Sequence, residues 1–184
     1  MNGHVYPEVG QPNDEQGYRE RKVLYHNLGD GKFADVSHDA GPGILEPASG
    51  RGCAFGDFDN DGDLDVLINC VNDLPQLLRC DSQLKNNWIK VKAIGVKSNR
   101  TGIGARIYCT PQGGRRLMDE VRSGGNYFSQ SDLRVHFGLG TARLADLEVH
   151  WPSGQVDRIK GAKANQAITV TEGKGSPETH SGSY

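Results

Sequence analysis

Seven short segments in the second half of this chain alternate between apolar and polar residues, and this alternation limits the folds the chain can adopt. A period of two residues places successive side chains on opposite faces of a strand. Glycine, proline, asparagine or serine bounds each segment, and these residues form turns. The segments are residues 87–95, 104–110, 115–121, 133–139, 145–151, 155–160 and 167–173. The pattern predicts an antiparallel β-sandwich or barrel.

The first half of the chain also reads as short strands joined by tight turns. The candidate strands are residues 21–27, 32–37, 52–58, 64–70 and 76–80. The whole chain has 25 glycines and 8 prolines in 184 residues, which favours many short elements over long helices. We therefore predict an all-β fold. Residues 174–184 lack apolar side chains that could pack, and we expect a disordered tail.

Charge divides the chain at about residue 82. Residues 1–82 carry 15 acidic and 6 basic side chains, whereas residues 83–184 carry 8 acidic and 15 basic ones. The resulting balances of −9 and +7 suggest two modules. These modules could attract each other, or the basic one could face an acidic glycan. A chance difference between two solvated surfaces is an equally open interpretation.

Four cysteines, at positions 53, 70, 80 and 109, form no CxxC pair. No histidine lies at zinc-finger spacing from them, so the sequence does not indicate a structural zinc site. We expect all four to be free and buried. The chain also has no apolar run of about 18 residues, so we expect no insertion into a membrane.

The segment "GDFDNDGDLD" concentrates five carboxylates in one short loop. Counting Asp57 as position 1, aspartates occupy positions 1, 3, 5, 7 and 9, and Gly62 at position 6 allows a sharp turn. Alternate residues of a coiled loop can point inward together and surround a cation. The predicted ligands are the side chains of Asp57, Asp59, Asp61 and Asp65 and the backbone carbonyl of Asp63.

Calcium is the cation that suits this loop best. Calcium takes six to eight oxygen ligands, whereas magnesium keeps several waters and leaves less room for carboxylates. An EF-hand opens with the same pattern, but it needs a bidentate glutamate at position 12, where this chain has Ile68. The flanks of the loop also read as strands and not as helices. An Asp-Gly turn that holds no metal remains the alternative.

The residues around this loop resemble a known repeat. "AFGDFDNDGDLDVLI" and "LYHNLGDGKFADVS" are similar to FG-GAP or VCBS repeats, the blades of β-propellers whose Asp-rich loop binds calcium. The second half, with "NNWIKVKAIG", "NRTGIGARI" and "VRSGGNYFSQSDLRVHFGLG", resembles the ASPIC/UnbV domain. In the cartilage acidic protein family and its bacterial relatives, that domain follows such repeats.

This resemblance implies a domain order and a class of function. Residues 1–82 would form the last blade or blades of a partial β-propeller, residues 83–173 an ASPIC/UnbV-like β domain, and 174–184 the tail. It also implies an extracellular, cell-surface or periplasmic location and a role in binding or adhesion. The predicted partners are calcium and either a carbohydrate or another surface protein, with no nucleic acid among them.

The sequence does not contain the enzyme motifs that we considered. "GLGTA" lacks the third glycine of a dinucleotide-binding loop, and GxSxG and HExxH do not occur. A non-catalytic binding module is therefore our prediction, and part of a polysaccharide-active enzyme with structural calcium is the alternative. Candidate ligand contacts are Arg122, Asn126 and Tyr127. Tyr127 and Phe128 form either an aromatic platform for a sugar or a simple turn, and both readings remain open.

An isolated blade would leave apolar faces and a strand edge uncovered. Exposed edges recruit partner strands. We therefore predict that the second domain of the same chain, or a second copy of the chain in a homo-oligomer, covers these surfaces.

Overall fold

A computed structural model describes residues 17–82 and 86–180 and shows an almost entirely β protein. The start of the predicted propeller segment, residues 1–16, lies outside the described residues, as do the last four residues of the predicted tail. The described chain divides into two compact units. The N-terminal unit comprises residues 17–56, 64–80 and 124–131, and the C-terminal unit comprises residues 57–63, 81–82, 86–123 and 132–180.

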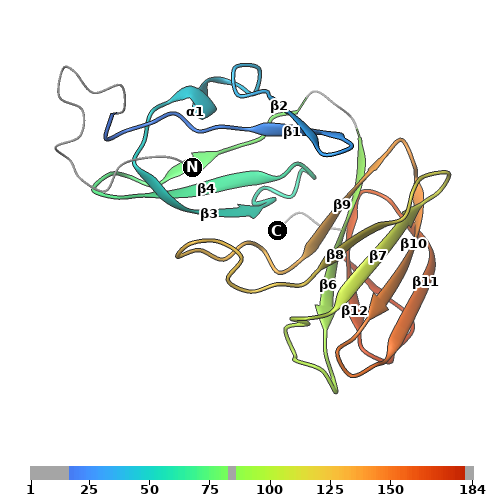
Figure 1. Ribbon diagram of the computed structural model, residues 1–184. Helices are drawn as coiled ribbons and strands as arrows, with labels where there is room; N and C mark the ends of the chain where they lie inside the picture. The colour runs from blue at the N-terminus through green and yellow to red at the C-terminus, as the bar shows by residue number, and fades with distance from the viewer. Residues whose placement is uncertain (1–16, 83–85, 181–184) are drawn as a thin grey trace. The chain divides into compact units, whose positions relative to one another are not determined.

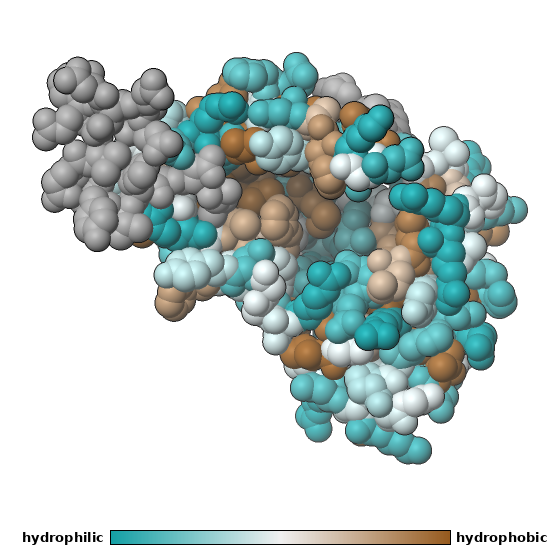
Figure 2. Space-filling view, viewed as in Figure 1, coloured by the Kyte–Doolittle hydropathy of each residue, from teal (hydrophilic) through white to brown (hydrophobic). Residues whose placement is uncertain are grey.

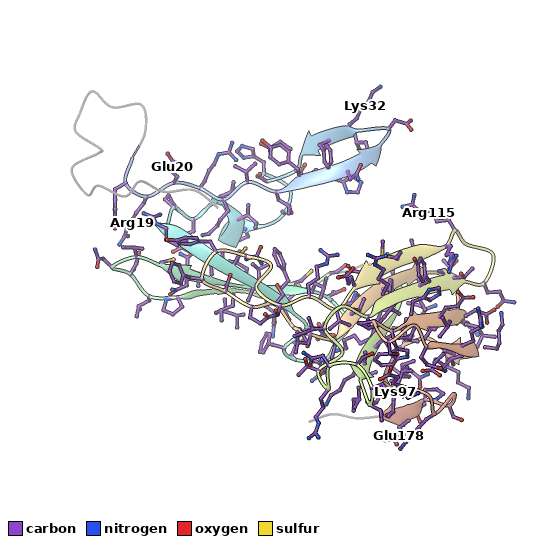
Figure 3. The ribbon with its side chains drawn as sticks, turned by 60° about the horizontal axis from the view of Figure 1, so that its bottom comes forward. Arg19, Glu20, Lys32, Lys97, Arg115 and Glu178 are labelled. Carbon is purple, nitrogen blue, oxygen red and sulfur yellow. The ribbon has the colours of Figure 1, made fainter. Side chains whose placement is uncertain are left out.

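The N-terminal unit contains two small antiparallel sheets and one helical turn. Its elements are β1 (Tyr25–Gly29), β2 (Lys32–Asp35), α1 (Pro42–Leu45), β3 (Gly50–Gly56), β4 (Asp65–Cys70) and β5 (Gln76–Leu78). Strands β1 and β2 form a hairpin, and Lys32, the first residue of β2, points away from the ribbon in Figure 3. Strands β3, β4 and β5 form the second sheet in that order, and Figure 1 shows β3 and β4 side by side. Among the described residues, no helix has the length and apolarity that crossing a membrane requires.

One face of the β3–β4–β5 sheet is packed, and the other is open. Ala48, Ile68 and Cys70 form a small buried cluster on the packed face. Buried Lys22 donates from Nζ to the backbone carbonyls of Gly43 and Glu46, 3.2 and 2.7 Å away, and so ties α1 to the unit. On the open face, the paired residues Leu67 and Leu77 are each 50% exposed. Figure 2 shows apolar residues in brown among hydrophilic residues in teal.

A segment from the second half of the chain covers the outer edge of β3. The side chains of Asn126 and Ser129 each donate to the carbonyl of Cys53 at 2.8 Å. The backbone N–H of Phe55 donates to Oγ of Ser131 at 3.2 Å. These bonds satisfy polar groups that an edge strand would otherwise present to other chains. At this edge, residues 124–131 of the N-terminal unit itself cover β3.

The C-terminal unit is built from two four-stranded sheets. One sheet has the order β11-β10-β7-β8 and the other has the order β13-β12-β6-β9. The strands are β6 (Asn87–Ile94), β7 (Arg106–Pro111), β8 (Leu117–Glu120), β9 (Val135–Gly140), β10 (Leu144–His150), β11 (Val156–Lys163), β12 (Gln166–Thr171) and β13 (Glu178–His180). Arg115 extends outward from the turn between β7 and β8 (Figure 3).

Side chains from both sheets form a single core in this unit. The core includes Ile89 and Val91 of β6, Ile107 of β7 and Leu147 of β10, each no more than 1% exposed. Figure 1 shows β6, β9 and β12 forming one layer and β7, β10 and β11 the other. Alternate residues of β6, β7, β9, β10 and β12 enter this core. The period-two pattern predicted a sandwich or a barrel, and the structure shows a sandwich.

Two details of the C-terminal unit differ from the sequence-based expectation. Strand β12 runs parallel to β6, with Val91 opposite Ile168, although every other described pairing is antiparallel. The two strands lie far apart in the sequence, so no hairpin dictates their relative direction. Strand β13 pairs with β12 within the segment for which we expected disorder, with Ile168 opposite Thr179.

Glu172 organises the loop that follows β6. One carboxylate oxygen accepts the backbone N–H groups of Val96, Lys97 and Ser98 at 2.6–2.8 Å. The other oxygen accepts the hydroxyl groups of Ser98 and Ser153. Burial acts to raise the pKa of Glu172, but these hydrogen bonds outweigh burial and lower the pKa from 4.5 to about 2.

Replacing Glu172 with glutamine should destabilise the protein in a pH-dependent way. The pKa of Glu172 is lower in the folded chain, so its ionised form stabilises the fold above about pH 4.5. This contribution should be lost as the pH falls towards 2. Urea unfolding of the wild type and Glu172→Gln should therefore differ most at pH 7 and converge at low pH. The exposed control Glu178→Gln should show no such trend, and a difference independent of pH would contradict the argument.

The four cysteines form no disulfide with one another. Cys70 and Cys109 are buried, whereas Cys53 and Cys80 are half-buried and so differ from the prediction. Burial raises the pKa of the Cys109 thiol to about 11, so this group is protonated and unreactive at neutral pH.

Candidate metal centre and its supporting residues

The Asp-rich loop follows β3 and leads into β4, where Gly56 pairs with Asp65. Residues 57–63 of this loop belong to the C-terminal unit. Asn60 and Gly62 have positive φ angles of 61° and 102°, which coil the backbone tightly. This coiling turns the carboxylates at positions 57, 59 and 61 towards one another.

Three of the five predicted metal ligands come together. One carboxylate oxygen from each of Asp57, Asp59 and Asp61 lies within 4.8 Å of the others. Asp57 is 1% exposed, and its Oδ1 atom has no hydrogen-bond partner within the described residues. A buried acceptor without a partner is costly, so this atom needs a cation or a donor. The donor set consists of oxygen atoms and fits a hard cation such as calcium.

Asp63 and Asp65 are not part of that group of three. The Asp63 carboxylate accepts the N–H of Ser82 at 3.1 Å. The buried Asp65 carboxylate accepts the N–H of Cys80 at 2.9 Å, within the N-terminal unit. Their proposed share in a metal site stays a prediction.

Lys90 supplies a fixed positive charge to the loop. Its Nζ lies 2.7 Å from Oδ2 of Asp57 and 3.0 Å from Oδ1 of Asn60. The side chain of Lys90 is only 2% exposed, and Nζ also lies 4.9 Å from the centre of the Trp88 ring. The N–H of Gly62 donates to the same Oδ2 at 2.9 Å. Asp57 is thus held through Oδ2, which leaves Oδ1 for another partner.

Trp88 and His136 hold the loop against strands β6 and β9. Their rings stack at 6.0 Å, and Nε2 of His136 lies 2.8 Å from the carbonyl oxygen of Gly62. Burial lowers the pKa of His136. Because the carbonyl oxygen of Gly62 can only accept, Nε2 is the donor of this bond. A Cβ atom on Gly62 would come within 1.9 Å of Nε1 of Trp88. His136 is itself half-buried.

The predicted ligand contacts occupy three different environments. Arg122 forms an ion pair with Asp119. Asn126 is half-buried and bonds to Cys53, so it supports the fold of the N-terminal unit. Tyr127 is 64% exposed and Phe128 is 85% exposed, and their rings meet edge to face at 4.6 Å. Phe128 also has a positive φ of 44°, which is rare for a bulky residue.

Lys90 and Trp88 did not stand out as site residues in the sequence. In "NWIKVKAIG", Trp88, Lys90 and Lys92 share one face of a strand. Lys90 is buried and Lys92 is exposed, yet nothing in the alternation separates the two. Lys90 is buried and Lys92 is not because the Asp-rich loop packs over Lys90 alone.

Comparisons with known proteins agree with the order of these elements. Residues 16–68 match the model of the FG-GAP-like repeat. Residues 95–177 match the model of ASPIC and UnbV. This chain carries an FG-GAP-like repeat followed by an ASPIC and UnbV domain. The Asp-rich loop lies at the end of the FG-GAP-like repeat, and Glu172 lies within the ASPIC and UnbV domain.

The chain is homologous to cartilage acidic protein 1. It is 32% identical to the protein of Xenopus tropicalis over 124 residues, which is 62% of this chain and 18% of that protein. It is 33% identical to the proteins of Mus musculus and Homo sapiens over 144 residues, which is 73% of this chain and 21% and 20% of those proteins. The chain thus spans about a fifth of the length of these curated relatives.

Proposed function

We propose that this chain is a calcium-binding, non-catalytic module of an extracellular or cell-surface binding protein. The observation that carries the proposal is the buried Oδ1 of Asp57, which has no hydrogen-bond partner in the described chain. The carboxylate of Asp57 also lies close to the carboxylates of Asp59 and Asp61. The homologues are named for cartilage, which supports a place outside the cell.

The residues of the loop would hold calcium in a preformed arrangement. Lys90 and the N–H of Gly62 fix Asp57 through Oδ2. The N–H of Asp63 donates to Oδ1 of Asp61 at 2.9 Å and restrains that carboxylate. Calcium would supply the charge that lets these carboxylates approach one another. Asp63, through its carbonyl, and Asp65 would complete the shell.

The ligand contact that we propose is the exposed pair Tyr127 and Phe128. Exposed aromatic rings offer a large contact area at a low cost in side-chain entropy. A carbohydrate or another surface protein is the proposed ligand. The open face that carries Leu67 and Leu77 is the surface through which copies of the chain would associate.

Calcium should raise the melting temperature of the protein, because a ligand that binds only the native state stabilises it. At about 1,000 times Kd the expected gain is about 4 kcal/mol. Thermal melting would be compared in calcium, in magnesium and in chelator, and magnesium should give a much smaller shift. Asp59→Ala should abolish the calcium response, whereas the exposed control Asp39→Ala should keep it. Identical melting curves in calcium and in chelator would refute calcium binding.

A further inference from the structure

The C-terminal unit contains a groove of about 680 Å³ that the proposed function does not use. It lies on β6 and β12, beside residues 100–101 and 132–134. Strand β9 pairs with β6 only as far as Val91 opposite Val135, whereas β6 continues to Ile94. The residues before β9 therefore leave the sheet, and a hollow opens beside the end of β6. Its volume is in the range of small-molecule sites, about 300–1,000 Å³.

Positive charge gathers at this groove. Lys92 and Arg100 are exposed, and neither has an ion pair within residues 17–82 and 86–180. Arg134 also lines the groove, but its Nε lies 2.6 Å from Oδ2 of Asp132, and that pair is neutral. Two uncompensated cations remain. Such a site attracts an anion, and the attraction weakens with salt.

The rest of the lining is largely aliphatic. Ile94 and Leu133 are half-buried and contribute apolar surface, together with small residues of β6 and β12, whereas the side chain of Ile168 is only 1% exposed and belongs to the core. A ligand that uses both parts of the groove needs an anionic group for Lys92 and Arg100 and an apolar body for the aliphatic lining. We propose that this groove binds a small organic anion with an aliphatic body, with its carboxylate or sulfate group against Lys92 and Arg100.

The lining also argues against larger partners. It comprises only 11 residues, whereas a stable protein interface uses about 20–30 residues on each side. None of these 11 residues is aromatic, and single-stranded nucleic acids are bound largely by stacking on aromatic rings. The size and chemistry of the groove therefore favour a small amphiphilic ligand.

Four probe molecules distinguish the need for an anionic group from the need for an aliphatic chain. Octanoate and octyl sulfate carry the same aliphatic chain with a carboxylate or a sulfate, octyl glucoside carries that chain without charge, and glucuronate is an anion without it. Each would be titrated below its micelle concentration into the full chain, and binding would be followed by calorimetry and by backbone amide NMR shifts. We expect at least one of the two octyl anions to bind at least tenfold more tightly than octyl glucoside and glucuronate. The stronger of the two identifies the preferred head group.

Paired variants test the position of the site. Lys92→Gln with Arg100→Gln should weaken binding of the octyl anion at least tenfold. The control Arg143→Gln with Lys163→Gln removes the same charge from two exposed residues outside the groove and should leave binding unchanged. Equal losses in both double variants, or equal binding of octyl glucoside, would overturn the proposal. Tighter binding of glucuronate would show an acidic-sugar site instead and would also overturn it. Melting curves in chelator would confirm that every variant is folded.

Discussion

Replacing Lys90 with methionine is expected to lower the free energy of unfolding by about 3–5 kcal/mol, measured by urea titration in chelator. The ammonium group of Lys90 and the carboxylate of Asp57 are 2.7 Å apart and almost fully buried. Methionine retains most of the volume but leaves a buried carboxylate without its counter-charge. This cost exceeds the value of the ion pair itself, because an uncompensated charge in a low dielectric is the larger penalty.

Two further variants test this explanation. Lys163→Met changes an exposed lysine of the same unit and should alter stability by no more than about 0.5 kcal/mol. Asp57→Asn added to Lys90→Met should recover part of the loss, because it removes the uncompensated charge. The loss of stability in the double variant would be compared with the losses in Lys90→Met alone and in Asp57→Asn alone. If it equals their sum, the charges of Lys90 and Asp57 are not coupled.

Replacing Gly62 with alanine should be nearly as damaging. A Cβ atom there would lie 1.9 Å from Nε1 of Trp88, so either the indole or the loop must move. The φ of +102° is also unfavourable for alanine. Together, overpacking and backbone strain should cost about 2–5 kcal/mol, measured by urea unfolding. The loop should also lose its bond to His136.

Gly140→Ala provides the matched control for Gly62→Ala. Gly140 has a φ of +58°, but a Cβ atom there would meet nothing within 4 Å. Its substitution measures backbone strain alone, at about 1–2 kcal/mol. The excess loss in Gly62→Ala then measures the contact with Trp88. Equal losses in the two variants would show that the loop does not press on the indole.

The strands of the C-terminal unit could be predicted closely because each has one buried face. The pattern in residues 145–151 predicted β10, which runs from Leu144 to His150. Residues 104–110 predicted β7, which runs from Arg106 to Pro111. In each strand, alternate residues enter a shared core, and solvent selects the polar side chains between them. The alternation of apolar and polar residues in the sequence therefore predicts these strands directly.

The pairing of distant strands could not be predicted in the same way. Strand β12 lies parallel to β6, and β13 adds to β12. Local alternation identifies a strand but says nothing about its neighbour unless a short turn connects the two. Residues 124–131 illustrate the same limit. They belong to the second half of the sequence, yet they cover β3 of the first.

The sequence by itself determined the all-β class, the order of the FG-GAP-like repeat and the ASPIC and UnbV domain, and the loop that gathers Asp57, Asp59 and Asp61. Each of these depends on residues that are close together in the chain, where spacing alone sets the direction of side chains. Only the tertiary structure decided that Lys90 pairs with Asp57 while Lys92 stays in solvent. Burial of a strand residue depends on what packs over it, and here the covering loop lies about thirty residues away in the sequence.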